Sequence, residues 1–154
     1  MKIQLIRVGK GKEPWADLAC AHYTRRLPSH LGFEERLLKP ARFVGDVEAV
    51  RRQEAKHVLA CLRDRDRLVV LDERGDGLST QGFAKLIESA AAQGTPRLVF
   101  AIGGPYGHGP EARKRAWKTI RLSDLVLNHA VARVVMVEQL YRASTLLWGG
   151  SYHH

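Results

Sequence analysis

The stretch with the clearest chemical meaning is residues 103–109, Gly-Gly-Pro-Tyr-Gly-His-Gly, which directly follows the apolar run Leu98–Ile102. A buried strand that runs into four glycines brings backbone N–H and C=O groups close to a ligand, because no Cβ stands in the way. In open α/β sheets, small molecules bind at the carboxyl ends of the strands. The stretch therefore predicts a cofactor site, and the alternative is a tight strand-to-helix turn without a ligand.

Two known phosphate-binding patterns do not describe this loop. A P-loop needs Gly-Lys-Ser/Thr at its end, and the dinucleotide fingerprint needs Gly-x-Gly-x-x-Gly. Gly104, Gly107 and Gly109 have a different spacing, and Pro105 removes a backbone donor. A phosphate-binding loop is therefore not favoured.

Acidic residues follow a second apolar run. Asp72 and Glu73 come directly after Leu68–Leu71, a short continuous apolar run that is typical of a strand buried on both faces. The carboxylates and the glycine loop would then share one rim, where the backbone of Leu71 could also face a cofactor. We favour a pair of solvated loop charges over a general acid here, because no second carboxylate pair is in register.

Charged side chains also recur at helical spacing late in the sequence. His129 and Arg133 are four residues apart, so they share one face if the last helix extends back that far. A hydrogen-bonded structural histidine is favoured over a base, and Arg133 alone would pair with a nearby acid. Glu138 and Arg142 have the spacing of an ordinary ion pair within a helix.

The sequence ends with Gly-Gly-Ser-Tyr-His-His. A frayed tail is the default expectation for such a segment. The alternative is a tail that folds back at its two glycines and brings its aromatic and histidine side chains to a site.

Composition narrows the class of protein and its partners. The net charge of +9 and the pI near 10.0 favour an acidic partner, of which nucleic acid is the first candidate. No apolar run approaches the roughly 20 residues that span a bilayer, so we expect no membrane contact and a cytoplasmic location. Cys20 and Cys61 lie in helical patterns without metal-ligand spacing, which predicts reduced thiols, no disulfide and no metal.

Strand and helix patterns alternate along the chain, which predicts an α/β fold with a mainly parallel sheet. A length of 154 residues is that of one domain. Asp46 and Ser79 are expected to cap helices, and Glu54 interrupts the apolar stripe of the second helix. The predicted strands are 3–8, 33–38, 68–71 and 98–102, the predicted helices are 14–27, 46–62, 79–90, 110–117 and 131–148, and apolar fragments lie at 119–122 and 125–127.

The final predicted helix is apolar around most of its circumference. A helix of that kind must be covered by more than one surface. A homodimer interface would supply the second surface.

Several motifs in a fixed order carry a resemblance to a known family. They are Leu-Asp-Glu-Arg-Gly at 71–75, Ile-Gly-Gly-Pro-Tyr-Gly at 102–107, Leu-Ser-Asp-Leu-Val-Leu at 122–127 followed by His129 and Arg133, Glu-Gln-Leu-Tyr-Arg-Ala at 138–143, and the terminal Tyr152-His153. Over essentially its whole length the chain resembles the RlmH family, also called YbeA, of the SPOUT class of methyltransferases. One departure is Asn128-His129-Ala130, where the family usually has Pro-His-Pro or Pro-His-Gln, and this loop is expected to be less rigid.

The resemblance implies an α/β sandwich with a C-terminal trefoil knot, in a homodimer, formed by a single SPOUT methyltransferase domain over residues 1–154. Knots are nearly absent from proteins, so this topology rests on the resemblance alone. The implied cofactor is S-adenosyl-L-methionine. The positions that match the family's cofactor-binding residues are Leu71, Gly103, Leu122, Ser123, Asp124, Leu125, Val126 and Leu127.

The implied reaction is methylation, without a metal, of the N3 nitrogen of a pseudouridine in bacterial large-subunit (23S) ribosomal RNA. The residues expected around the target nucleotide are His129, Arg133, Arg142, Tyr152 and His153. His153 is the preferred base and Arg142 the stabiliser of the anionic ring, while other basic residues would contact rRNA phosphates within assembled ribosomes. The alternatives are a ribosome-associated RNA-binding protein that has kept the fold without catalysis, and a transfer-RNA methyltransferase of the same class.

Overall fold

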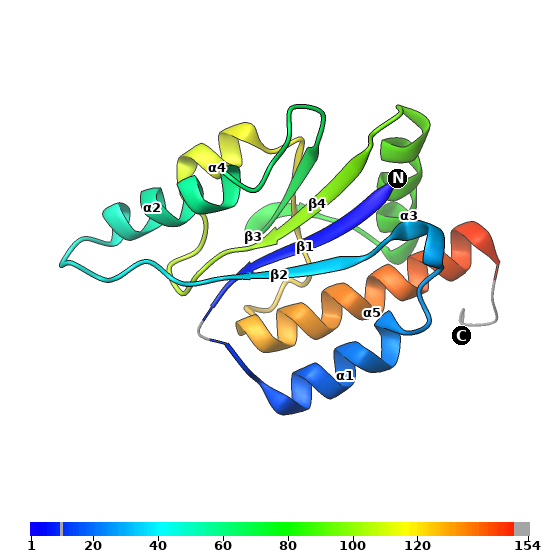
Figure 1. Ribbon diagram of the computed structural model, residues 1–154, viewed down its shortest axis with the longest axis horizontal. Helices are drawn as coiled ribbons and strands as arrows, with labels where there is room; N and C mark the ends of the chain where they lie inside the picture. The colour runs from blue at the N-terminus through cyan, green and yellow to red at the C-terminus, as the bar shows by residue number, and fades with distance from the viewer. Residues whose placement is uncertain (10, 150–154) are drawn as a thin grey trace.

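Five parallel strands form the centre of the part of the chain that the computed structural model describes, residues 1–9 and 11–149 (Figure 1). They lie in the order β2-β1-β4-β3-β5, and each neighbouring pair is parallel. The predicted α/β fold with a mainly parallel sheet is therefore confirmed. The strands are β1 (Lys2–Val8), β2 (Glu34–Leu38), β3 (Arg67–Gly77), β4 (Arg97–Ile102) and β5 (Lys118–Arg121), and the helices are α1 (Pro14–Thr24), the short 3-10 helix η1 (Ser29–Leu31), α2 (Val47–Leu59), α3 (Thr80–Ala92), α4 (Pro110–Arg115) and α5 (His129–Trp148).

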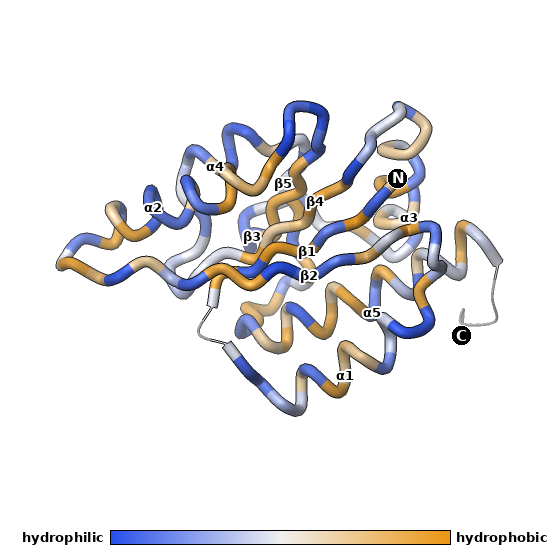
Figure 2. The backbone as a smooth tube through the Cα atoms, viewed as in Figure 1, coloured by the Kyte–Doolittle hydropathy of each residue, from blue (hydrophilic) through white to orange (hydrophobic). Residues whose placement is uncertain are grey.

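Helices cover both faces of the sheet. Ile3 and Leu5 of β1 belong to the larger core, which lies beneath α1, α3 and α5. Ile6 and Val8 point to the opposite face and belong to a smaller core beneath α2. Because β4 is buried on both faces, its sequence is apolar almost throughout, whereas the start of the edge strand β2 is hydrophilic (Figure 2).

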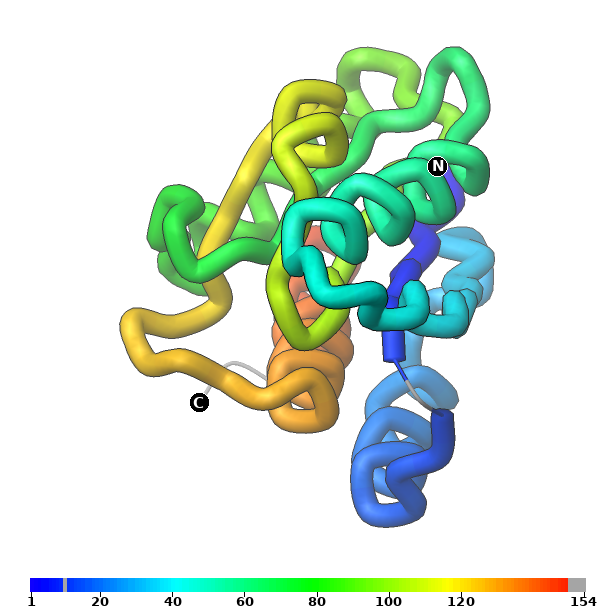
Figure 3. The backbone as a smooth tube through the Cα atoms, turned by 90° about the vertical axis from the view of Figure 1, so that its left-hand side faces the viewer, coloured from blue at the N-terminus to red at the C-terminus, as the bar shows by residue number. Residues whose placement is uncertain are grey.

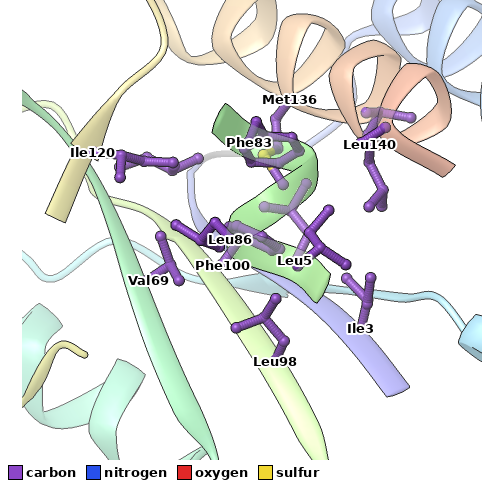
Figure 4. Packing of buried hydrophobic residues seen from close by; sticks show 14 of the residues in the cluster. Ile3, Leu5, Val69, Phe83, Leu86, Leu98, Phe100, Ile120, Met136 and Leu140 are labelled. Carbon is purple, nitrogen blue, oxygen red and sulfur yellow. The ribbon is translucent and has the colours of Figure 1, made fainter. Parts of the chain in front are cut away.

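The final helix α5 is covered largely within the chain. It packs against α1 and α3 on one side of the sheet (Figure 1). Met136 and Leu140 point into the larger core beside Phe83 and Phe100, whose ring centroids are 5.5 Å apart (Figure 4). These contacts account for much of the apolar circumference that suggested a dimer, and Val137 is itself buried in the core. The homodimer stays a prediction.

In the described part of the chain, no helix is both long and apolar enough to cross a membrane.

Polar side chains fix the starts of three helices. Asp46 caps α2 and Ser79 caps α3 through side-chain hydrogen bonds, as predicted. Asn128 caps α5, because its Oδ1 accepts a hydrogen bond from the N–H of Val131 at 2.9 Å. The helix therefore begins at His129, two residues before the predicted start. Asn128 thus fixes the start of α5.

Helices α1, α2 and α4 end earlier than predicted, and α1 and α2 do so for the same reason. After Thr24 and after Leu59 the backbone tightens into hydrogen bonds between residues three apart, as is common in a last turn. Cys61 consequently lies beyond α2 rather than inside a helix, and the expectation from the sequence pattern was wrong. Cys20 is in α1 as expected, and burial raises the pKa of its thiol to about 11.

β3 is longer than the predicted strand 68–71 because it resumes after a bulge. Ile120 of β5 pairs with Leu71 before the bulge and with Asp76 after it. A Cβ on Gly75 would lie 2.6 Å from the backbone of Ile120, so the bulge can pass β5 only with glycine at this position. The bulge re-aims residues 72–75 at the carboxyl end of the sheet.

Candidate active site

A cavity of about 470 Å³ opens at the carboxyl ends of β3, β4 and β5, beside the first turn of α5. Its volume is in the ordinary range for a ligand site. Figure 3 looks onto this end of the sheet, with the yellow-green glycine loop and the golden loop that leads into α5. The cavity is lined by residues 71–74, 102–108, 121–123, 125–127, 129 and 132, together with Arg51 of α2.

The glycine loop is packed tightly against α2. A Cβ on Gly104 would lie 2.2 Å from Oε2 of Glu54, and one on Gly109 would lie 2.7 Å from the carbonyl oxygen of Arg51. The loop closes on itself through a hydrogen bond from the N–H of Gly107 to the carbonyl of Gly104 at 2.9 Å. At Gly104 and Gly109 glycine is therefore needed because α2 of the same chain lies close. The predicted approach of a cofactor to this loop stays a prediction.

His108 anchors the glycine loop to β4. Its ring is buried, and Nε2 donates a hydrogen bond to the carbonyl oxygen of Ala101 at 3.0 Å. Burial lowers the pKa of His108 to about 4, so the ring is neutral at pH 7. A Cβ on Gly103 would lie 3.0 to 3.1 Å from the backbone of Gly107 and His108, so a side chain there would displace the loop itself.

Asp72 is a buried member of an ion-pair network, which corrects the expectation of a solvated loop charge. Nε and Nη2 of Arg74 donate hydrogen bonds to the two carboxylate oxygens of Asp72, each at 2.8 Å. Nη1 of Arg113 lies 3.6 Å from Oδ2 of Asp72. The hydrogen bonds from Arg74 lower the pKa of Asp72 to about 2. The bulge in β3 turns the carboxylate inward, while Glu73 is exposed as expected. The network holds the guanidinium of Arg74 at the cavity wall.

The loop after β5 brings most of the expected cofactor positions to the cavity. Leu71, Gly103, Leu122, Ser123, Leu125, Val126 and Leu127 all line it. Asp124 does not line it, because its carboxylate pairs with Nε of Arg121 at 2.7 Å. The Ser123 hydroxyl accepts the N–H of Leu125 at 2.9 Å and shapes the turn. Leu125 and Val126 are 76% and 82% exposed and form an open apolar lip.

His129 and Arg133 share a helix but have different surroundings. His129 lies in the first turn of α5 and lines the cavity. Desolvation lowers the pKa of its imidazole, and the negative charge of Glu54 opposes that shift. Arg133 is buried and is not among the lining residues, because it pairs with Glu35 of β2 and Asp17 of α1. The pairing of Arg133 with nearby acids is as expected.

Arg142 is not among the lining residues of the cavity. Nη2 of Arg142 lies 2.7 Å from Oε1 of Glu138 on the same helix, so the expected ion pair within the helix is present. Tyr152 and His153 lie outside the described residues, and their predicted roles stay predictions.

The contacts of Arg51, Glu54 and His108 with the loops around the cavity were not predicted from the sequence. Nε of Arg51 donates a hydrogen bond to the carbonyl oxygen of Tyr106 at 2.7 Å. These residues are 55 apart in the sequence, so no local sequence pattern predicts the contact. Glu54 did give a signal, because a carboxylate interrupting an apolar stripe indicates a buried acid with a specific partner. Among the described residues, no cluster of three or more His, Cys, Asp or Glu side chains has the arrangement of a metal site.

Comparisons with known proteins match the whole chain. The family model described as "Predicted SPOUT methyltransferase" matches residues 1–153. A protein of Arabidopsis thaliana, provisionally named as an RNA methyltransferase, is 41% identical over 155 residues, which cover all of this chain and 80% of that protein. The proteins named ribosomal RNA large subunit methyltransferase H of Cytophaga hutchinsonii and Trichlorobacter lovleyi are 36% and 38% identical, with both chains covered completely. This chain belongs to the SPOUT methyltransferase family.

Proposed function

We propose that this chain transfers a methyl group from S-adenosyl-L-methionine to the N3 nitrogen of a pseudouridine in bacterial large-subunit (23S) ribosomal RNA. The observation that carries the proposal is one cavity lined by all the expected cofactor positions except Asp124. Family membership supports the methyl transfer, and the names of the bacterial relatives support the rRNA substrate.

The residues around the cavity suit this cofactor. The glycine loop and residues 121–127 offer backbone groups at close range, with Leu122 and Leu127 as apolar walls for a flat adenine ring. The exposed carboxylate of Glu73 lies on the same wall and complements a positive charge. When bound, the cofactor supplies a methyl group on a positively charged sulfur, which an electron-rich ring nitrogen can take.

The reaction also requires removal of the proton from N3. This proton leaves before or during methyl transfer, so a base at the cavity rim accelerates the reaction. His129 lies at that rim, and its lowered pKa keeps the imidazole neutral and able to accept a proton near pH 7. His153 remains the other proposed base, with Tyr152 beside it. Arg142 is proposed to stabilise the anionic ring, and Arg133 to act as a positioning residue that holds the start of α5.

The proposal includes the assembly and setting of the enzyme. Residues 1–154 act as one SPOUT domain with a C-terminal trefoil knot, and two copies form the functional homodimer. The substrate is rRNA in assembled ribosomes, which puts the protein in the cytoplasm. The charge of +9 favours contacts with rRNA phosphates.

A methyl-transfer assay tests the function directly. Ribosomes and naked rRNA from a strain lacking this protein are incubated with purified protein and S-adenosylmethionine carrying a labelled methyl group. We expect label at N3 of one pseudouridine of the 23S rRNA, located by mass spectrometry of nuclease fragments. Label in transfer RNA alone would assign a different substrate. Ribosome binding without cofactor binding, measured by calorimetry, would assign a non-catalytic role.

A further inference from the structure

Two aromatic side chains from distant parts of the sequence meet on the surface beside the cavity. Phe43 is 54% exposed and Tyr106 is 38% exposed, and their ring centroids are 6.0 Å apart at an angle of 35°. Tyr106 lines the cavity, whereas Phe43 extends the aromatic surface beyond it. The two loops that carry them run next to each other, cyan and yellow-green in Figures 1 and 3.

Helix α2 holds both members of this pair. Nε of Arg51 donates to the carbonyl oxygen of Tyr106 at 2.7 Å. One turn further along, Oε1 of the buried Glu54 accepts the N–H of Ala41 at 3.0 Å, two residues before Phe43. Side chains of α2 therefore hold the backbone of both loops that carry the rings. An aromatic surface that is held in place binds a flat partner with little loss of conformational entropy.

The surroundings of the pair are basic. The loop between β2 and α2, residues 39–46, carries Phe43 together with the exposed Lys39 and Arg42. Its one acidic residue, Asp46, caps α2 and pairs with Arg52 at 3.6 Å. Aromatic side chains interleaved with lysine and arginine are typical of surfaces that bind unpaired nucleotides, because bases stack on the rings while cations meet the phosphates. Such charge does not suit an apolar peptide or a lipid chain.

We propose that Phe43 and Tyr106 form a stacking platform for an unpaired rRNA base next to the methylated nucleotide, with Lys39 and Arg42 contacting the flanking phosphates. The platform rests on the proposed function, because it takes rRNA as the partner. Because Phe43 does not line the cavity, RNA binding at this residue is separate from cofactor binding. The platform thus determines how the substrate is presented to the site.

Phe43→Ala is the discriminating variant, because Phe43 does not line the cavity. The full-length protein is assayed for binding to naked 23S rRNA without cofactor, and for methyl transfer to ribosomes. We expect the dissociation constant for rRNA and the KM for ribosomes to rise at least about 5-fold, the lower end of the effect of losing one stacked base. The affinity for S-adenosylmethionine and the sedimentation mass should not change.

Matched variants separate stacking from other causes. Val44→Ala alters an exposed residue of the same loop that has no ring, and it should leave rRNA binding unchanged. Phe43→Trp should retain binding, and Arg42→Gln should reduce the salt dependence of binding. Unchanged rRNA affinity in Phe43→Ala would overturn the platform, and a change in sedimentation mass would assign the surface to a second copy of the chain. An unmodified protein that binds rRNA but transfers no methyl group would instead refute the proposed function.

Discussion

Arg133 and Glu35, 98 residues apart in the sequence, are joined by two parallel hydrogen bonds. Nε of Arg133 donates to Oε1 of Glu35 and Nη2 donates to Oε2, each at 2.6 Å. Nη1 donates to Asp17. The Arg133 side chain is only 7% exposed. Because His129 lies one helical turn earlier, this pairing fixes the part of α5 that carries a cavity residue.

Removing that guanidinium should cost stability. We expect Arg133→Ala to lower the free energy of unfolding by about 2 to 3 kcal/mol, less than for a fully buried pair because both carboxylates keep some contact with water. Urea denaturation at pH 7 measures the change. Arg52→Ala, which breaks the exposed ion pair with Asp46, is the control and should cost less than about 1 kcal/mol. Normal unfolding of Arg133→Ala together with lost methyl transfer would instead place Arg133 at the nucleotide.

The strands, helix caps and glycine loop could be predicted from the sequence, because they depend on residues that are close together in the chain. The alternating run in β1, the continuous apolar run in β4, the caps at Asp46 and Ser79, and the glycine loop at a strand end all follow from residue type and spacing. Asp72 was misjudged because the bulge that buries it depends on how β5 pairs with β3. The pairing of Arg51 with Tyr106 depends on where α2 lies against the sheet. Contacts of this kind are set by tertiary packing, which spacing along the chain does not encode.

The close fit between Gly104 and Glu54 makes a sharp prediction about the cofactor loop. Gly104→Ala puts a methyl group where Oε2 of Glu54 lies, so the loop or the carboxylate must move. We expect the loop to shift and the affinity for S-adenosylmethionine to fall about 10-fold, equal to about 1.4 kcal/mol and within the usual cost of overpacking. Calorimetric titration measures it.

Two further variants of this loop test the cause. Glu54→Ala combined with Gly104→Ala should recover part of the affinity, because the second change removes the clashing group. Gly9→Ala, whose new Cβ would lie at an ordinary 3.9 Å from Cδ1 of Leu37, should leave the affinity for S-adenosylmethionine unchanged. Equal affinity of the unmodified protein and Gly104→Ala would contradict a rigid contact between the loop and α2.

His108 should make the protein acid-sensitive. Its folded pKa of about 4 lies below its ordinary value of 6.5, so the unfolded chain binds the proton more tightly. Stability is therefore unaffected by this group above pH 6.5 and falls as the pH drops from 6.5 to 4, by about 3 kcal/mol in all. Asp72 acts at lower pH, since its pKa is lowered from 3.8 to about 2.

Urea denaturation at pH 7.5 and pH 4.5 isolates the contribution of His108. His108→Gln should be less stable than the unmodified protein at pH 7.5, because the hydrogen bond to Ala101 is weakened or lost. Its loss of stability on acidification should be smaller by about 2 to 3 kcal/mol, because glutamine does not titrate. A parallel loss in both proteins would mean that His108 is accessible to protons in the folded state.

The identity of the base can be decided by the pH dependence of methyl transfer. If His129 takes the proton from N3, the rate rises with pH through the pKa of its imidazole, which desolvation puts below 6.5. His129→Asn should then lower the rate at saturating cofactor and ribosome by about 100-fold and remove that limb of the profile. Glu54→Gln should move the limb to lower pH, because the negative charge that raises the pKa of His129 is gone. A limb that persists in His129→Asn and disappears in His153→Asn would transfer the role of base to His153.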